Sequence, residues 1–244
     1  MTTRIATACT SALLLVSCHQ QGVTSAAQSR PSGMVPIVIS TERGDISVSL
    51  DSAHAPVTVT NFLRYVDRGA FTDGRFHRTV TRENQPRDTV RIEVIQGSAR
   101  TTRPDSSFPA VVLERTSVTG LRHLDGTISM ARGGPNSATS SFFITIGTQP
   151  SLDEGGHRNL DGQGFAAFGR VTAGMELVRA IQQSPHTEQN LTPPIAIRSV
   201  RRLYPKRTAD PAQRALPSRP FRASCRWPQT STDTRKFVSP ASPR

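Results

Sequence analysis

The chain has 244 residues, a hydrophobic fraction of 35% and a formal net charge of +12. This length and apolar content are sufficient for one globular core. Residues 205–244 carry nine Lys or Arg and two acidic residues, so much of the excess charge lies on a terminal segment. That distribution argues against a basic groove that follows nucleic-acid phosphates. The three cysteines, Cys9, Cys18 and Cys225, flank the patterned region, which excludes an internal disulfide framework.

Residues 1–18 predict an export signal. Arg4 precedes an apolar run that ends at Cys18 and is too short to span a bilayer. The last four residues of the run resemble a bacterial lipobox, in which Cys18 would be lipidated and become the mature N-terminus. The alternative is ordinary cleavage near residues 25–27. In both cases we expect an exported, periplasmic bacterial protein, with membrane contact only through a lipid on Cys18.

A flexible linker is predicted over residues 19–34, because Gln, Ser, Ala and Gly dominate there without periodicity. The folded domain is predicted over 35–204. Alternating runs at 35–41 and 45–50 predict its first β-hairpin. Pro56 then begins a helical pattern. The apolar positions of this helix and its stop are Val59, Phe62, Leu63, Val66 and Gly69.

The middle of the chain predicts strands separated by long connections. Two strands lie between Phe71 and Gly97, on either side of a polar insert at 81–89. We expect this insert to be a surface excursion, because longer surface loops cost little extra closure entropy. Residues 100–125 contain prolines and little periodicity, and predict an irregular connection.

Residues 126–147 predict two strands around a loop of Gly, Pro, Asn and Ser. A loop with little side-chain bulk lets an extended peptide approach the backbone amides. A plain β-connection that binds nothing is the alternative. A second polar loop at 151–164 is followed by a strand that begins at Phe165, and residues 195–203 form the last strand. A second helix is indicated by Met175, Leu177, Val178 and Ile181.

Many strands and only two helices predict a mainly β fold, a closed antiparallel eight-stranded β-barrel capped by two α-helices. After this domain, residues 205–244 are rich in Arg, Pro, Ser and Thr and predict a disordered tail. The tail is either a binding arm, for nucleic acid or anionic lipid, or a reading-frame artefact.

Three motifs in order resemble those of the cyclophilins, a family of peptidyl-prolyl cis-trans isomerases. The segment 129–144, with its Ser-Met-Ala and Phe-Phe-Ile ends, resembles the most diagnostic stretch of the family. Phe-His-Arg at 76–78 followed by Val-Ile-Gln-Gly at 94–97, and the strand motif at 164–171, resemble two others. The resemblance covers roughly residues 35–203 and implies the cyclophilin-like barrel.

The resemblance also implies the site. Arg78 matches the catalytic arginine that points at the prolyl amide, and Gln96 matches the glutamine that holds it. The other matching substrate-binding positions are His77, Val94, Ala131, Arg132, Phe143, Leu152 and Phe165. The resemblance implies no cofactor, and His54, His123, His157 and His186 show no metal-ligand spacing. The implied partners are proline-containing polypeptides, bound by a monomer, with no nucleic acid.

Several residues depart from the family pattern. Glu93 stands where the family has a pocket Phe, Ser141 where it often has Gln, and Ser151 where it has Trp or Phe. Arg132 replaces the usual Asn. We therefore expect reduced isomerase activity and weak affinity for cyclosporin, the family's cyclic-peptide inhibitor. The alternative function is a cyclophilin-like module that binds proline segments with little or no turnover.

Overall fold

The computed structural model describes residues 33–86, 88–100 and 108–203. The predicted signal with Cys18, nearly all of the predicted linker and the 205–244 tail lie outside these ranges and remain predictions. The first strand begins at Met34, one residue before the predicted domain boundary.

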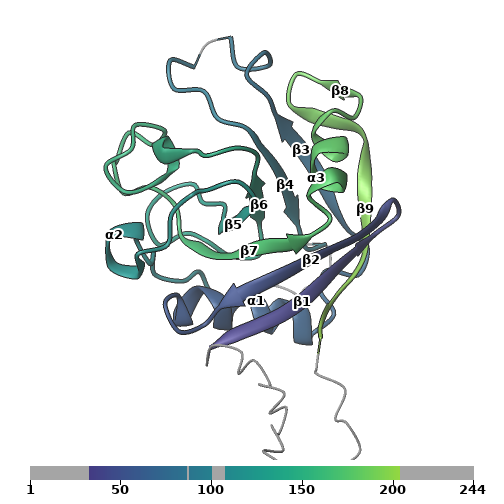
Figure 1. Ribbon diagram of the computed structural model, residues 1–244, viewed down its shortest axis with the longest axis horizontal. Helices are drawn as coiled ribbons and strands as arrows, with labels where there is room; N and C mark the ends of the chain where they lie inside the picture. The colour runs from purple at the N-terminus through teal and green to yellow at the C-terminus, as the bar shows by residue number, and fades with distance from the viewer. Residues whose placement is uncertain (1–32, 87, 101–107, 204–244) are drawn as a thin grey trace, which may run out of the picture. The chain divides into compact units, whose positions relative to one another are not determined.

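Eight strands close into an antiparallel barrel (Figure 1), which confirms the predicted fold class. The order is β1-β2-β7-β5-β6-β4-β3-β9, and pairing of β1 with β9 closes the ring. A two-residue strand, β8, adds to β9 alone. The strands are β1 (Met34–Thr41), β2 (Gly44–Asp51), β3 (Gly74–Val80), β4 (Val94–Ser98), β5 (Thr127–Met130), β6 (Phe142–Thr145), β7 (Ala167–Ala173), β8 (His186–Thr187) and β9 (Asn190–Arg202). Closure leaves the eight barrel strands, all of these except β8, without an unpaired edge.

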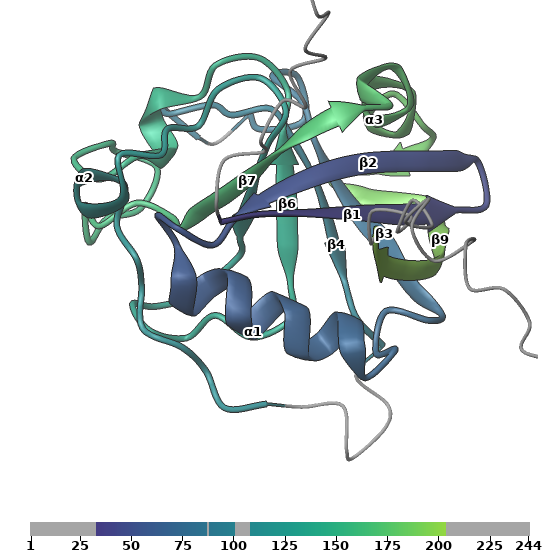
Figure 2. The same ribbon diagram turned by 60° about the horizontal axis from the view of Figure 1, so that its bottom comes forward.

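The two predicted helices are present and lie toward opposite ends of the barrel (Figures 1 and 2). Helix α1 (Pro56–Asp67) begins at the predicted proline, whose fixed φ suits the first helical turn. It ends before Gly69, which adopts a φ of +63°. Helix α3 (Met175–Gln182) follows β7 directly. A one-turn helix, α2 (Thr116–Thr119), lies in the connection that the sequence predicts to be irregular.

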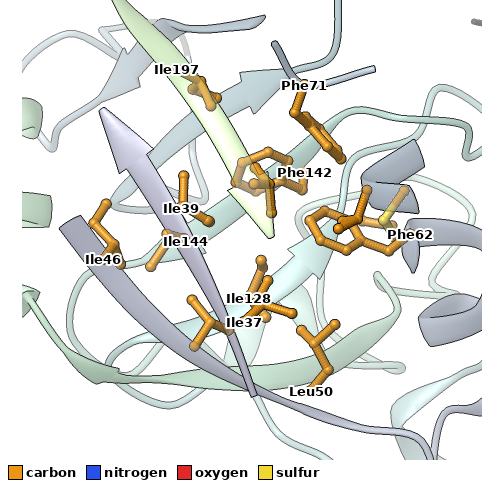
Figure 3. Close-up of a cluster of buried hydrophobic side chains, with 14 of the residues drawn as sticks. Ile37, Ile39, Ile46, Leu50, Phe62, Phe71, Ile128, Phe142, Ile144 and Ile197 are labelled. Carbon is orange, nitrogen blue, oxygen red and sulfur yellow. The ribbon is translucent and has the colours of Figure 1, made fainter. Parts of the chain in front are cut away.

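The interior of the barrel is filled by alternate strand residues and by one face of α1 (Figure 3). Phe62 of α1 lies 5.0 Å from Phe71 and 5.6 Å from Phe142, between ring centroids. Ile37, Ile39 and other buried branched residues fill the part of the core away from these aromatic rings (Figure 3). Alternation in the strands therefore sends one set of side chains into this core and leaves the other set on the outer face.

Two local predictions need correction. The strand predicted to begin at Phe165 begins at Ala167, because Phe165 precedes the ladder and pairs only with Leu152 through its backbone N–H. The last strand begins at Asn190, not 195, since it first forms a short hairpin with β8. The insert leaves β3 and β4 paired on either side of it, as expected of a surface excursion, although one of its side chains is buried. Its Gln85 is 2% exposed and hydrogen-bonds the backbone of Ile92 in both directions.

Candidate active site

A β-bulge in β3 turns Arg78 to the outer face of the barrel. Without a bulge, Phe76 and Arg78 would point the same way, because strand side chains alternate with a period of two. The register instead pairs Phe76 with Gly97 and Arg78 with Gln96, which leaves His77 as the extra residue. Phe76 is fully buried in the core, whereas Arg78 is partly exposed. The bulge thus re-aims one side chain, a common use of this feature.

Cross-strand pairing then places three predicted site residues in one row. Gln96 of β4 pairs with Arg78 on one side and with Phe143 of β6 on the other. Residues directly opposite one another in antiparallel strands have neighbouring side chains on the same face. The predicted grouping of Arg78, Gln96 and Phe143 therefore follows from the barrel's register.

The Arg78 guanidinium is held by two glutamines. Its Nη1 donates to Gln96 Oε1 at 2.9 Å, while Nε and Nη2 donate to Gln189 Oε1 at 2.9 and 2.6 Å. Gln189 in turn donates to the backbone oxygen of Asn84 in the insert. Burial, and then the nearby charge of Arg158, lower the pKa of Arg78. Sequence analysis missed Gln189, which lies in the turn between β8 and β9.

A hollow of about 210 Å³ with an apolar floor opens beside this guanidinium. Its floor belongs to a hydrophobic cluster separate from the barrel core, formed around Val94, Phe143 and Leu152. Phe165 stands edge-on to Phe143, with ring centroids 5.3 Å apart. The full lining is Arg78, Ile92, Val94, Gln96, Ala131, Arg132, Phe143, Leu152, Arg158, Asn159 and Phe165. A proline-sized apolar group beside a fixed cation fits this geometry.

Apart from His77, every substrate-site residue predicted from the sequence lines the hollow. His77 is half-buried beside Arg78, and burial lowers its pKa, with Arg78 and Arg75 adding to the effect against a backbone hydrogen bond. Three lining residues were not predicted: Ile92, Arg158 and Asn159. Ile92 is buried and supplies apolar wall next to the expected aromatic position, while Glu93 is engaged with Arg82 at 3.2 Å.

Arg132 holds the loop that precedes β7 through an ion pair and a backbone hydrogen bond. Its Nη1 and Nη2 donate to the two carboxylate oxygens of Asp161, at 2.7 and 2.9 Å, and its Nε donates to Gly164 O at 2.8 Å. The guanidinium lies 5.2 Å from the Phe165 ring centroid. These hydrogen bonds lower the pKa of Asp161 to about 2. Arg132 stands where the family resemblance implies Asn. Its ion pair with Asp161 therefore fixes a cation against Phe165, at the side of the hollow.

Arg158, in the 151–164 loop, contacts the insert and the segment that follows it. Its Nη1 donates to Asp88 Oδ2 at 2.9 Å and to Val90 O at 2.7 Å. The insert and the β8–β9 turn also meet, since Asn84 Nδ2 donates to Glu188 O (Figure 1). Between them lies a larger cavity of about 650 Å³, which shares Arg78 with the hollow and includes Glu83, Asp88 and Glu188 in its lining.

A buried Ser-His-Asp chain lies behind the hollow. His123 donates through Nδ1 to Asp153 at 2.7 Å, and its Nε2 lies 3.0 Å from Ser129 Oγ. The arrangement resembles a hydrolase triad, but Ser129 and the His123 side chain are 0% exposed. A hydroxyl without access to solvent cannot attack a peptide. The His123 ring stacks 6.0 Å from Phe143, so the chain supports the floor of the hollow.

Asp153 makes stability depend on pH. Burial opposes its ionisation, but hydrogen bonds from His123 and the charge of Arg122 outweigh this and lower the pKa of Asp153. A lowered folded-state pKa means that the stabilisation is present above about pH 4 and is lost as the pH falls through the folded value. We expect Asp153→Asn to cost about 1 kcal/mol at pH 7 and less at pH 3. Urea unfolding at both pH values measures this, and an equal cost at pH 7 and pH 3 would contradict it.

Within residues 33–86, 88–100 and 108–203, no group of three His, Cys, Asp or Glu residues is placed to hold a metal ion. No helix in those ranges has the length and apolar character needed to cross a membrane.

Comparisons with known proteins agree with this geometry. The family described as cyclophilin type peptidyl-prolyl cis-trans isomerase/CLD matches residues 36–202. Peptidyl-prolyl cis-trans isomerase A of Dickeya dadantii is 34% identical over 148 residues, which cover 60% of this chain and 70% of that protein. Peptidyl-prolyl cis-trans isomerase cyp18 of Streptomyces antibioticus is 34% identical over 150 residues, 61% and 84% of the two chains.

Solved structures share the fold. A cyclophilin type peptidyl-prolyl cis-trans isomerase of Cryptosporidium parvum superposes with a TM-score of 0.57 at 22% identity, covering 70% of this chain and 99% of the other. A second structure of that protein, in the presence of the dipeptide Ala-Pro, gives a TM-score of 0.56 at 21% identity, with the same coverage.

Proposed function

The chain belongs to the cyclophilin-type peptidyl-prolyl cis-trans isomerase family and is an isomerase of that class, and we propose that Arg78 is its catalytic residue. The observation that supports this role is the fixed guanidinium, held by Gln96 and Gln189 beside a hollow with an apolar floor. The remaining lining residues would bind the substrate.

Rotation about an X-Pro bond is slow because amide resonance must be lost, with a barrier of roughly 18–20 kcal/mol. No covalent bond breaks, so no general base or nucleophile is required. In the twisted state the imide nitrogen becomes pyramidal and gains a lone pair. A hydrogen-bond donor that meets this lone pair stabilises the transition state more than the planar ground states, which is what accelerates the reaction.

Arg78 has the donors for this task. Gln189 accepts from Nε and Nη2, and Gln96 accepts from Nη1. Each terminal nitrogen keeps a second N–H, since Nη1 and Nη2 each carry two hydrogens. The neighbouring Phe143 and Val94 would hold the proline ring. Holding the ring while the guanidinium meets the imide nitrogen is the division of labour that we propose.

The substrates would be proline-containing polypeptides. The structural neighbour solved in the presence of Ala-Pro supports this class. We further propose that these polypeptides are exported ones in a bacterium, on the basis of the signal pattern that ends at Cys18. Mass spectrometry of the mature N-terminus tests the latter point, because a lipidated Cys18 and cleavage near residue 26 give different masses.

A proline-binding module without turnover is the second candidate. It is favoured by Ser151 and Glu93, which replace two aromatic residues of the family pocket. A protease-coupled assay on an Ala-Pro peptide separates the two functions. An isomerase accelerates the slow phase in proportion to enzyme concentration, whereas a module leaves that phase unchanged while still binding the peptide.

Gln189 is proposed as a positioning residue for Arg78. We expect Gln189→Ala to lower kcat about ten-fold with little change in KM, because Arg78 keeps its charge but loses two of its three hydrogen bonds. Stopped-flow assays over a range of peptide concentrations measure both constants. Gln183→Ala, at the exposed end of α3, is the matched control. A rise in KM with unchanged kcat would instead indicate a role in substrate binding.

A further inference from the structure

The hollow is unbalanced in charge. Arg78, Arg132 and Arg158 line it, and no Asp or Glu is among its lining residues in the described part of the chain. The carboxylate partners of two of these arginines, Asp161 and Asp88, are outside the lining. A peptide that enters the hollow therefore meets guanidinium groups and apolar walls.

Arg158 is anchored but keeps unused donors. Its Nη1 carries both of its hydrogen bonds, to Asp88 and to Val90 O. Nε and Nη2 have no hydrogen-bond partner among the described residues. The side chain is only 16% exposed, and it lines the hollow. Arg132 differs, because all three of its nitrogens are engaged with Asp161 and Gly164.

Two further observations indicate that this site suits an anionic group. Arg158 acts on Arg78 as a like charge, and lowers its pKa in addition to the effect of burial. Placing two cations beside one small cavity costs energy that a bound anion would offset. In addition, the Nδ2 of Asn159 is buried without a hydrogen-bond partner in the described structure, and Asn159 lines the same hollow. The site therefore holds more donors than acceptors.

We propose that Arg158 makes this enzyme selective for substrates with an Asp or Glu next to the proline, whose carboxylate binds the Nε–Nη2 edge of the guanidinium. This rests on the proposed isomerase function. The edge suits a carboxylate, because two parallel N–H donors match its two oxygens. Asp88 occupies Nη1, so the substrate does not need to displace it. Asp88 instead holds Arg158 toward the hollow.

The test compares kcat/KM for matched peptides with Glu, Gln or Lys immediately before or after the proline. We expect the Glu peptide to exceed its Gln partner about five-fold at low salt in at least one of the two positions, because charge-assisted hydrogen bonds are roughly twice as strong as neutral ones. The preference should shrink in 1 M NaCl, where screening is strong. Arg158→Gln should reduce the Glu-to-Gln ratio to about one.

Two variants separate this role from a purely structural one. Asp88→Asn keeps a side-chain oxygen that can accept from Arg158 Nη1 but removes the negative charge beside the guanidinium, so it should keep or raise the Glu preference. If the Arg158–Asp88 pair only held the insert in place, Asp88→Asn and Arg158→Gln would change the Glu-to-Gln ratio equally. Arg179 of α3 forms an ion pair with Asp125, away from the hollow. Arg179→Gln breaks that pair and should leave the Glu-to-Gln ratio unchanged. Equal rates for Glu and Gln peptides, or a preference for Lys, would overturn the proposal. Failure to accelerate any peptide would instead reject the isomerase function.

Discussion

Arg78→Ala is expected to lower kcat/KM for an Ala-Pro peptide about 100- to 1000-fold. That range is typical for the loss of one preorganised electrostatic donor at a reacting centre. The fold should survive, because Arg78 lies on the outer face of β3 and its partners Gln96 and Gln189 can turn to solvent. A protease-coupled assay gives the rate, and thermal unfolding checks the fold.

Two companion variants sharpen this result. Arg78→Lys keeps a positive charge but cannot hold the fork to Gln96 and Gln189, so we expect most of the activity to be lost. Arg75→Ala removes an exposed arginine from the same strand, outside the lining of the hollow, and should retain wild-type activity. Similar losses in Arg75→Ala and Arg78→Ala would show that the effect is not specific to the Arg78 guanidinium.

Phe142→Ala should mainly reduce stability, whereas Phe143→Ala should mainly reduce activity. These neighbours on β6 point to opposite faces, with Phe142 in the barrel core against Phe62 and Phe143 in the floor of the hollow. We expect Phe142→Ala to cost about 3–5 kcal/mol of unfolding free energy, the usual cost of a large cavity in a core. Phe143→Ala should cost less stability, because part of its ring borders the open hollow.

The loss of activity should follow the reverse order. Phe143→Ala removes the floor that would contact the proline ring, and about 2 kcal/mol of lost apolar contact corresponds to about a 30-fold fall in kcat/KM. Folded Phe142→Ala should keep most of its activity at low temperature. Urea unfolding and the coupled assay measure both quantities on the same samples. A larger activity loss in Phe142→Ala than in Phe143→Ala would contradict the assignment of faces.

Much of the barrel could be predicted from local patterns. The hairpin at 35–50, helix α1 from Pro56 and helix α3 from Met175 carry the expected alternation, proline start and helical spacing. Errors occurred where a strand begins without a local signal. The first part of β9 contains prolines and polar residues, and its pairing with β8 depends on a turn rather than on alternation.

The site was predictable where residues lie on strands. Arg78, Gln96 and Phe143 come together through barrel register, but a simple alternation would have put Arg78 on the same face as Phe76. Gln189 and Arg158 could not be found from local pattern, because each contacts the site from a loop distant in sequence. The Arg78–Gln189 hydrogen bond joins residues 111 positions apart. Only the folded chain brings such pairs together.

Exchange NMR at saturating Ala-Pro peptide measures cis–trans interconversion on the enzyme itself, separately from binding. If Arg78 stabilises the twisted imide, Arg78→Ala should bind the peptide with an affinity close to that of the wild type, while the bound peptide interconverts at least about 100-fold more slowly. Equal interconversion rates in the two proteins would contradict the role proposed for Arg78.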